Sequence, residues 1–211
     1  MTKMTSLYRS VCVLLVLTSA GCGALLGKAE PMGVRYFTPT LAAVSTGPAS
    51  STAPPLRLGR IESSDHLRER MAFRASAHEV GYHEGLRWTE RPDTYFRRAL
   101  GRELFESGRF AHVVAGVAPT LEAELVAFEE LRQNSAVRVE ARILVHDGRR
   151  VLLERTIRVE ESRKGNEPAV ITEALSRALQ KCVAQISSEV EAALSALPSR
   201  SASAVEPTTP S

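Results

Sequence analysis

The chain has 211 residues, enough for one domain with a sizeable core, and its formal net charge at pH 7 is +3. Two of its basic residues, Lys3 and Arg9, lie in a predicted signal peptide, so the remaining chain is nearly neutral. Basic and acidic residues are interleaved along that remainder without a basic stripe, which argues against nucleic acid as a partner.

Residues 1–21 have the pattern of a secretory signal peptide. A basic start is followed by an apolar run of roughly ten residues and then by small residues. A helix that spans a bilayer needs about twenty apolar residues, so this run is too short to be a transmembrane helix. We therefore expect the chain to be exported.

The end of this segment resembles a bacterial lipobox. Ala20 and Gly21 stand immediately before Cys22, and in a lipobox that cysteine is acylated on its sulfur and becomes the new N-terminus. The residue after the cysteine is Gly23 rather than the Asp that favours retention at the inner membrane, so we expect Cys22 to be a lipid anchor in the outer membrane. The alternative is an ordinary signal peptide cut near Ala20 or Ala24.

The cysteines predict no intrachain disulfide. Cys12 leaves with the signal peptide and Cys22 is the lipid attachment site, so Cys182 has no partner even in an oxidising compartment. We expect Cys182 to be a small, buried, apolar residue.

The composition divides the rest of the chain. Residues 22–34 are read as a tether, 35–197 as one domain, and 198–211 as a disordered tail rich in Pro, Ser, Thr and Ala. Inside the domain, residues 41–55 have the same composition and no apolar periodicity, which predicts a flexible loop.

The first half of the domain contains short extended segments. Strands are expected at Arg35–Thr38 and Leu56–Ser63, and a strand pair at Met71–Ser76 and Glu79–Glu84 with a break around Ala77.

A helix follows these strands. Pro92 suits the first helical turn, Asp93 favours the positive N-terminal end, and an apolar stripe continues to Leu104 before Gly108 ends the helix. Phe110–Ala115 is then expected to be a strand.

The second half has clearer patterns. Apolar residues alternate strictly with mostly polar ones over 137–146, which predicts a half-buried strand. Asp147-Gly148 predicts a type I′ turn into a returning strand that continues to Val159. Residues 121–131 also alternate and are read as a strand, although their Glu and Leu content also permits a helix.

The last predicted element is a helix over 168–197 with an apolar stripe at helical spacing. We expect this stripe to pack against the sheet. In the alternative, the final turns project beyond the domain and pack on a partner. The elements together predict a single α/β domain in which a mixed β-sheet is packed by one mid-chain helix and a long C-terminal helix.

No catalytic or metal-binding motif stands out. His78 and His83 are five residues apart, which on a strand sends the rings to opposite faces, so one metal ion cannot take both. No serine lies in a nucleophile elbow, and no glycine-rich phosphate loop occurs. The carboxylate pairs Glu129-Glu130 and Glu160-Glu161 are expected to be solvated. We therefore predict no enzyme activity, no cofactor and no metal.

The only tryptophan, Trp88, stands just before the first predicted helix and is expected to pack beneath its start. Trp88, Tyr82 and Arg87 are the candidate structural or interface residues.

Several short motifs resemble one family in order and spacing. They are Arg35-Tyr36-Phe37-Thr38-Pro39, Leu56-Arg57-Leu58-Gly59-Arg60-Ile61, Met71-Ala72-Phe73-Arg74, His78-Glu79-Val80-Gly81-Tyr82-His83-Glu84 and Arg87-Trp88-Thr89-Glu90-Arg91-Pro92. The chain resembles the ABC-type transport auxiliary lipoproteins, the paraquat-inducible lipoprotein C group, over residues 35–197.

The resemblance implies a periplasmic, lipid-anchored α/β domain without catalytic residues. It would serve an ABC transporter whose MCE-domain protein moves lipids between the two membranes, docking that protein at the outer membrane, with homo-oligomerisation left open. The alternatives are an envelope scaffold or a ligand-binding lipoprotein that works without a transporter, and, least favoured, an unrecognised hydrolase.

Overall fold

The computed structural model describes residues 33–41 and 52–196. The predicted signal peptide, the predicted lipid attachment site Cys22, most of the predicted loop 41–55 and the predicted tail 198–211 lie outside the described residues. The compact unit described below belongs to Val34–Ser211.

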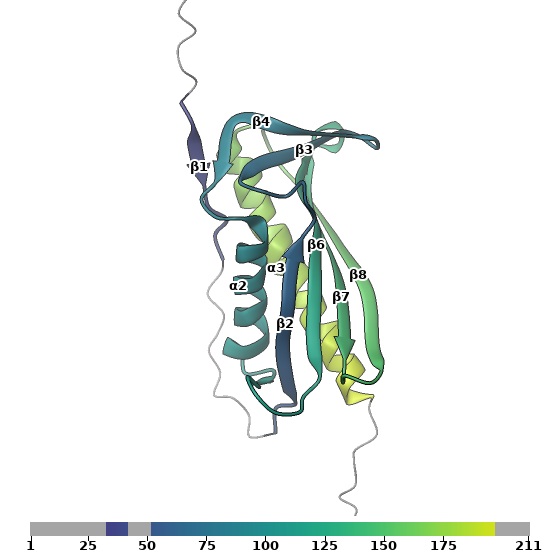
Figure 1. Ribbon diagram of the computed structural model, residues 1–211. Coiled ribbons are helices and arrows are strands. Elements are labelled where there is room, and N and C mark those ends of the chain that lie inside the picture. The colour runs from purple at the N-terminus through teal and green to yellow at the C-terminus, as the bar shows by residue number, and fades with distance from the viewer. Residues whose placement is uncertain (1–32, 42–51, 197–211) are drawn as a thin grey trace, which may run out of the picture. The chain divides into compact units, whose positions relative to one another are not determined.

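The unit is a mixed α/β domain, as predicted, with an eight-stranded sheet and two α-helices (Figure 1). In chain order the elements are β1 (Arg35–Phe37), β2 (Pro55–Ser63), β3 (Arg70–Ser76), β4 (Glu79–Trp88), α2 (Pro92–Gly101), the π-helical turn η1 (Arg102–Glu106), β5 (Ala111–His112), β6 (Thr120–Leu131), the 3₁₀ turn η2 (Arg132–Asn134), β7 (Ala136–His146), β8 (Val151–Ser162) and α3 (Pro168–Ser195).

Strand β6 organises the sheet. Its one edge pairs with β7 along the whole strand, and β7 pairs in turn with β8, both in antiparallel register. Its other edge is shared by two parallel strands, because β2 pairs with the first half of β6 and β3 with residues 129–131. β4 extends the sheet antiparallel to β3, and β1 adds to β4 in parallel. The strand assignment of 121–131 is therefore confirmed.

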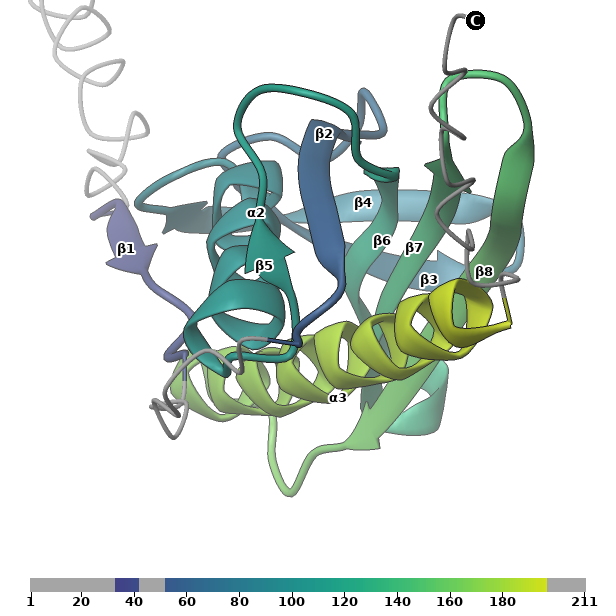
Figure 2. The ribbon, with the colours of Figure 1, turned by 90° about the horizontal axis from the view of Figure 1, so that it is seen from below.

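Both helices pack on the same sheet and touch each other (Figure 2). α2 lies against β2, and α3 crosses β7 and β8. The apolar stripe of α3 faces the core up to its last turns, where Val190 and Leu194 are buried. The predicted packing of this helix on the sheet is confirmed, and the alternative of final turns that project from the domain is wrong.

The β7–β8 hairpin is confirmed, but its predicted type I′ turn is wrong. That turn needs positive φ at both central residues, and only Gly148 has it, with φ of 86°. The connection instead spans Asp147–Arg150. The Asp147 carboxylate accepts the backbone N–H groups of Arg149 and Arg150 at 3.0 Å each, which also lowers the pKa of Asp147. A side chain thus closes the turn without left-handed backbone at Asp147.

The predicted strand Phe110–Ala115 is much shorter than expected. Only β5 pairs with the sheet, opposite the first two residues of β2. Because β6 runs parallel to β2, as β5 does, the chain must return to the start of β6, and it leaves extended pairing to do so. The returning loop exposes Val114 and Val117 and turns at Gly116, where φ is 96°.

Candidate functional site

The adjacent carboxylates Glu129 and Glu130, near the end of β6, are buried. Their exposed fractions are 0% and 3%, so the expectation that this pair is solvated is wrong. Neighbouring residues of a strand point to opposite faces, and each carboxylate has therefore acquired its own set of basic partners. A buried carboxylate is tolerated only when it is paired and hydrogen-bonded.

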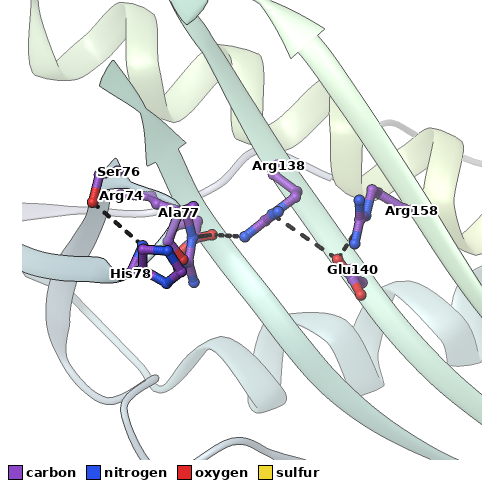
Figure 3. A network of polar contacts seen from close by, with 8 residues as sticks. Arg74, Ser76, Ala77, His78, Arg138, Glu140 and Arg158 are labelled. Carbon is purple, nitrogen blue, oxygen red and sulfur yellow. Dashed lines mark hydrogen bonds and ion pairs between the residues drawn. The ribbon is translucent and has the colours of Figure 1, made fainter. Parts of the chain in front are cut away.

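Glu129 belongs to a row of charges that crosses the sheet. Arg74 of β3 donates from Nε to Oε1 at 2.8 Å and from Nη2 to Oε2 at 3.3 Å, and Arg138 of β7 donates to the same carboxylate. Arg138 Nε also lies 4.0 Å from Glu140, which accepts a bond of 2.8 Å from Arg158 on β8 (Figure 3). The row ties β3, β6, β7 and β8 together.

Glu130 is paired on the other face. Arg163 Nη2 lies 2.5 Å from its Oε1, and His83 Nε2 lies 2.7 Å from its Oε2, although the angle of the His83 contact is outside hydrogen-bond geometry. Arg163 also donates to the Gly165 carbonyl and to Asn166, which holds the segment between β8 and α3. Burial alone would raise the pKa of Glu130, but His83, Arg163 and Arg132 outweigh burial and lower this pKa below 4.5.

The lowered pKa of Glu130 predicts a loss of stability in acid. A carboxyl whose pKa is lower in the folded state contributes stability above its unfolded pKa, and that contribution is lost as the pH falls through the folded pKa. The gap in unfolding free energy between the wild type and Glu130→Gln should therefore be constant above about pH 5 and narrow below it. Urea unfolding of both proteins at each pH measures this gap. A gap that does not change with pH would contradict the prediction.

These charges have the arrangement of a structural network. Both carboxylates are neutralised, and the buried thiol of Cys182 has a pKa raised to about 12, so it stays protonated at neutral pH. Cys182 is buried, as predicted.

His78 lies in the turn between β3 and β4, away from the His83–Glu130 pair, and the described part of the chain has no group of three His, Cys, Asp or Glu able to hold a metal. In the second carboxylate pair, Glu160 is exposed as expected, whereas Glu161 pairs with Arg177 and Lys181 of α3.

The three candidate structural or interface residues all lie on β4, but they differ in burial and in their contacts. Trp88 is 1% exposed, and its ring meets Tyr95 of α2 and Phe128 of β6 edge-on, with centroids 6.3 and 5.3 Å away. Tyr82 and Arg87 are half-buried. The Tyr82 hydroxyl donates to the His66 carbonyl at 3.1 Å, and Arg87 donates to the Leu86 carbonyl at 2.9 Å.

Arg70 joins two of these residues and was missed by the sequence reasoning. It pairs in register with Arg87, and its guanidinium lies 4.4 Å from the centre of the Tyr82 ring. The bulge in the β3–β4 pairing allows one arginine to reach both residues. No spacing rule would have found this, because the bulge is set by Gly85 with φ of 69° and not by a repeat.

Comparison with known proteins gives the family. The family model for the ABC-type transport auxiliary lipoprotein component matches residues 38–187. The fold is similar to a crystal structure of a Xanthomonas campestris protein of family DUF330, with a TM-score of 0.68 and 16% identity over 76% of this chain and 97% of that one. It is also similar to the crystal structure of an uncharacterized protein, with a TM-score of 0.60 and 13% identity over 74% of this chain and 97% of that one.

No curated protein matches the sequence. Among the described residues, no helix has the length and apolar character needed to cross a bilayer. The family match covers most of the domain, from just after β1 into the second half of α3. The chain therefore belongs to the family of ABC-type transport auxiliary lipoproteins.

Proposed function

We propose that this chain is a non-enzymatic, lipid-anchored subunit of an MCE-type ABC transport system that moves lipid between the inner and outer membranes. Its role is to dock the MCE protein at the outer membrane. The observation that carries the proposal is the match of residues 38–187 to an auxiliary lipoprotein component of ABC-type transport. An auxiliary component needs a membrane anchor and a partner surface rather than a catalytic centre.

The anchor in this proposal is Cys22, acylated after cleavage of residues 1–21, with the domain facing the periplasm. Several acyl chains on one cysteine hold a protein on a membrane, where a single chain is marginal. Gly23 after the cysteine favours the outer membrane over retention at the inner one. The palmitate-type chains attach the domain to the membrane through the tether.

The polar network also fits a docking role. Each buried carboxylate is held by at least two basic groups, so the charges connect strands β3, β4, β6 and β7 with the segment between β8 and α3. A rigid domain loses little conformational entropy when it binds a partner.

The test is purification of the C-terminally tagged chain from detergent-solubilised envelopes of its own host, followed by mass spectrometry. We expect an MCE-domain protein in stoichiometric yield, together with the ATPase and permease of its transporter. Other envelope proteins in place of the MCE protein would favour a scaffold that works without a transporter. The matched control is Cys22→Ala, which should leave a folded domain that no longer fractionates with membranes; retention in the membrane fraction would contradict the anchor.

A further inference from the structure

The strand register gathers aromatic and basic side chains at the end of the domain where the described chain begins. Tyr36 of β1 pairs with Arg87 of β4, and Arg87 pairs with Arg70 of β3, so the three lie side by side across the sheet. Their side chains lie on one face of the sheet. Trp88 follows Arg87 in β4, so its buried side chain lies on the opposite face. Together with Val34 and Tyr82 these residues are here named the tether-side patch.

This patch exposes apolar surface. Tyr36 is 64% exposed and Val34 is 51% exposed, which makes them two of the five large apolar side chains left open in the described chain. Tyr36 lies in β1, a three-residue edge strand, and Val34 immediately precedes that strand, where the predicted tether ends. Scattered exposed valines need no explanation, but here an exposed tyrosine and an exposed valine stand only two residues apart at one edge of the sheet.

The two arginines of the patch have no anionic partner in residues 33–41 and 52–196. Arg87 donates only to a backbone carbonyl, and Arg70 lies over the Tyr82 ring. The exposed carboxylates closest in sequence, Glu69 and Glu84, form no ion pair with either of them. Like charges placed directly opposite each other across two strands are destabilising. This contrasts with Arg74, Arg138 and Arg163, which are all paired with carboxylates.

An external anion would relieve this repulsion, and its source follows from the position of the patch. The chain between Cys22 and Val34 spans at most about 40 Å when fully extended, so an anchored domain keeps the patch within that reach of the membrane. Arginine binds phosphate through two parallel hydrogen bonds, and tyrosine is favoured where an apolar layer meets a polar one. These two properties, together with the position of the patch where the predicted tether ends, favour a phospholipid surface as its partner.

We propose that the tether-side patch rests on the membrane that holds the lipid anchor and binds the phosphate-bearing headgroups of anionic phospholipids. The patch then orients the domain, with Tyr36 and Val34 at the headgroup level. This inference rests on the proposed function only for the lipid anchor and not for the identity of the transporter.

The first test uses the unacylated chain from Gly23 onward, which keeps the whole compact unit Val34–Ser211. Its affinity is measured by co-sedimentation with vesicles of phosphatidylcholine, with and without phosphatidylglycerol. We expect binding that needs the anionic lipid and that weakens about 30-fold in Arg70→Gln/Arg87→Gln, since each basic residue at an anionic surface contributes about 1 kcal/mol. Thermal unfolding of the variant confirms that it remains folded.

The matched control is Arg149→Gln/Arg155→Gln, which removes the same charge from exposed positions on the β7–β8 hairpin. Because this control leaves the tether-side patch unchanged, its affinity for the vesicles should stay within about twofold of the wild type. An equal loss in both double variants would mean non-specific attraction by net charge and would overturn the proposal. Absence of binding to the anionic vesicles would overturn it as well.

The second test uses the acylated full chain in vesicles. Cysteine is introduced either as Tyr36→Cys or as Val117→Cys and labelled with an environment-sensitive fluorophore; Cys182 stays unlabelled because it is buried. Val117 lies in the loop before β6, at the opposite end of the sheet from β1 and β4 (Figure 1). We expect a blue shift and quenching by headgroup-labelled lipid at position 36 only. Equal signals at both positions would contradict the membrane-binding proposal even if the MCE protein co-purifies. A signal at position 36 only, without co-purification of the MCE protein, would contradict the transporter assignment alone.

Discussion

Glu130→Ala is expected to lower the free energy of unfolding by roughly 3–5 kcal/mol, the largest effect of any single charge removal in this domain. Its partner Arg163 has a side chain only 4% exposed, so the guanidinium cannot turn towards water when the carboxylate is gone. The variant is left with an uncompensated buried cation beside His83, which is the costly way to break a buried pair. Urea unfolding followed by circular dichroism measures the loss.

Two further variants separate this mechanism from a general loss of charge. Glu129→Ala should cost less than Glu130→Ala, because Arg74 and Arg138 are 24% and 15% exposed and can recover hydration. Glu154→Ala, on the exposed side of β8, should change the unfolding free energy by no more than about 0.5 kcal/mol. A loss at Glu129 equal to or greater than the loss at Glu130 would show that burial of the arginine partner does not set the cost.

These charge pairs also mark the limit of what could be read from the sequence. The alternation in β7 and the apolar stripe of α3 are local patterns, and both predicted their elements correctly. The burial of Glu129 and Glu130 depends mainly on partners in β3, β4, β7 and the segment after β8, and the local sequence around position 130 does not indicate these contacts. Adjacent glutamates in a strand place one carboxylate on each face of the sheet. The sequence does not show that other parts of the chain bury both faces at the end of β6.

The candidate residues of β4 show the same difference between what a local pattern predicts and what tertiary contacts decide. Trp88 could be expected in the core because a lone tryptophan before a helix has a large apolar surface to bury. The neighbourhood of Tyr82 and Arg87 could not be derived, because it depends on the bulge between Arg70 and Ala72 in the pairing of β3 with β4. Tertiary register, rather than local propensity, therefore decides which side chains form the tether-side patch.

Trp88→Ala is expected to lower the free energy of unfolding by roughly 3–5 kcal/mol, which is the usual cost of removing a large buried aromatic side chain. The indole fills the junction where β4 ends and α2 begins, between Tyr95 and Phe128, and the structure around it cannot collapse freely because both neighbours are themselves buried. Far-UV circular dichroism in urea follows unfolding without the tryptophan signal.

Trp88→Phe separates the volume of the indole from its polar group. In the described chain the buried Trp88 Nε1 has no hydrogen-bond acceptor, so phenylalanine removes an unpaired donor while it keeps most of the apolar volume. We therefore expect a loss of only about 1–2 kcal/mol, well below that of alanine, and almost none for the exposed control Tyr36→Ala. Equal losses for phenylalanine and alanine would mean that the indole N–H makes an interaction on which the junction depends, and that the cavity is the lesser cost.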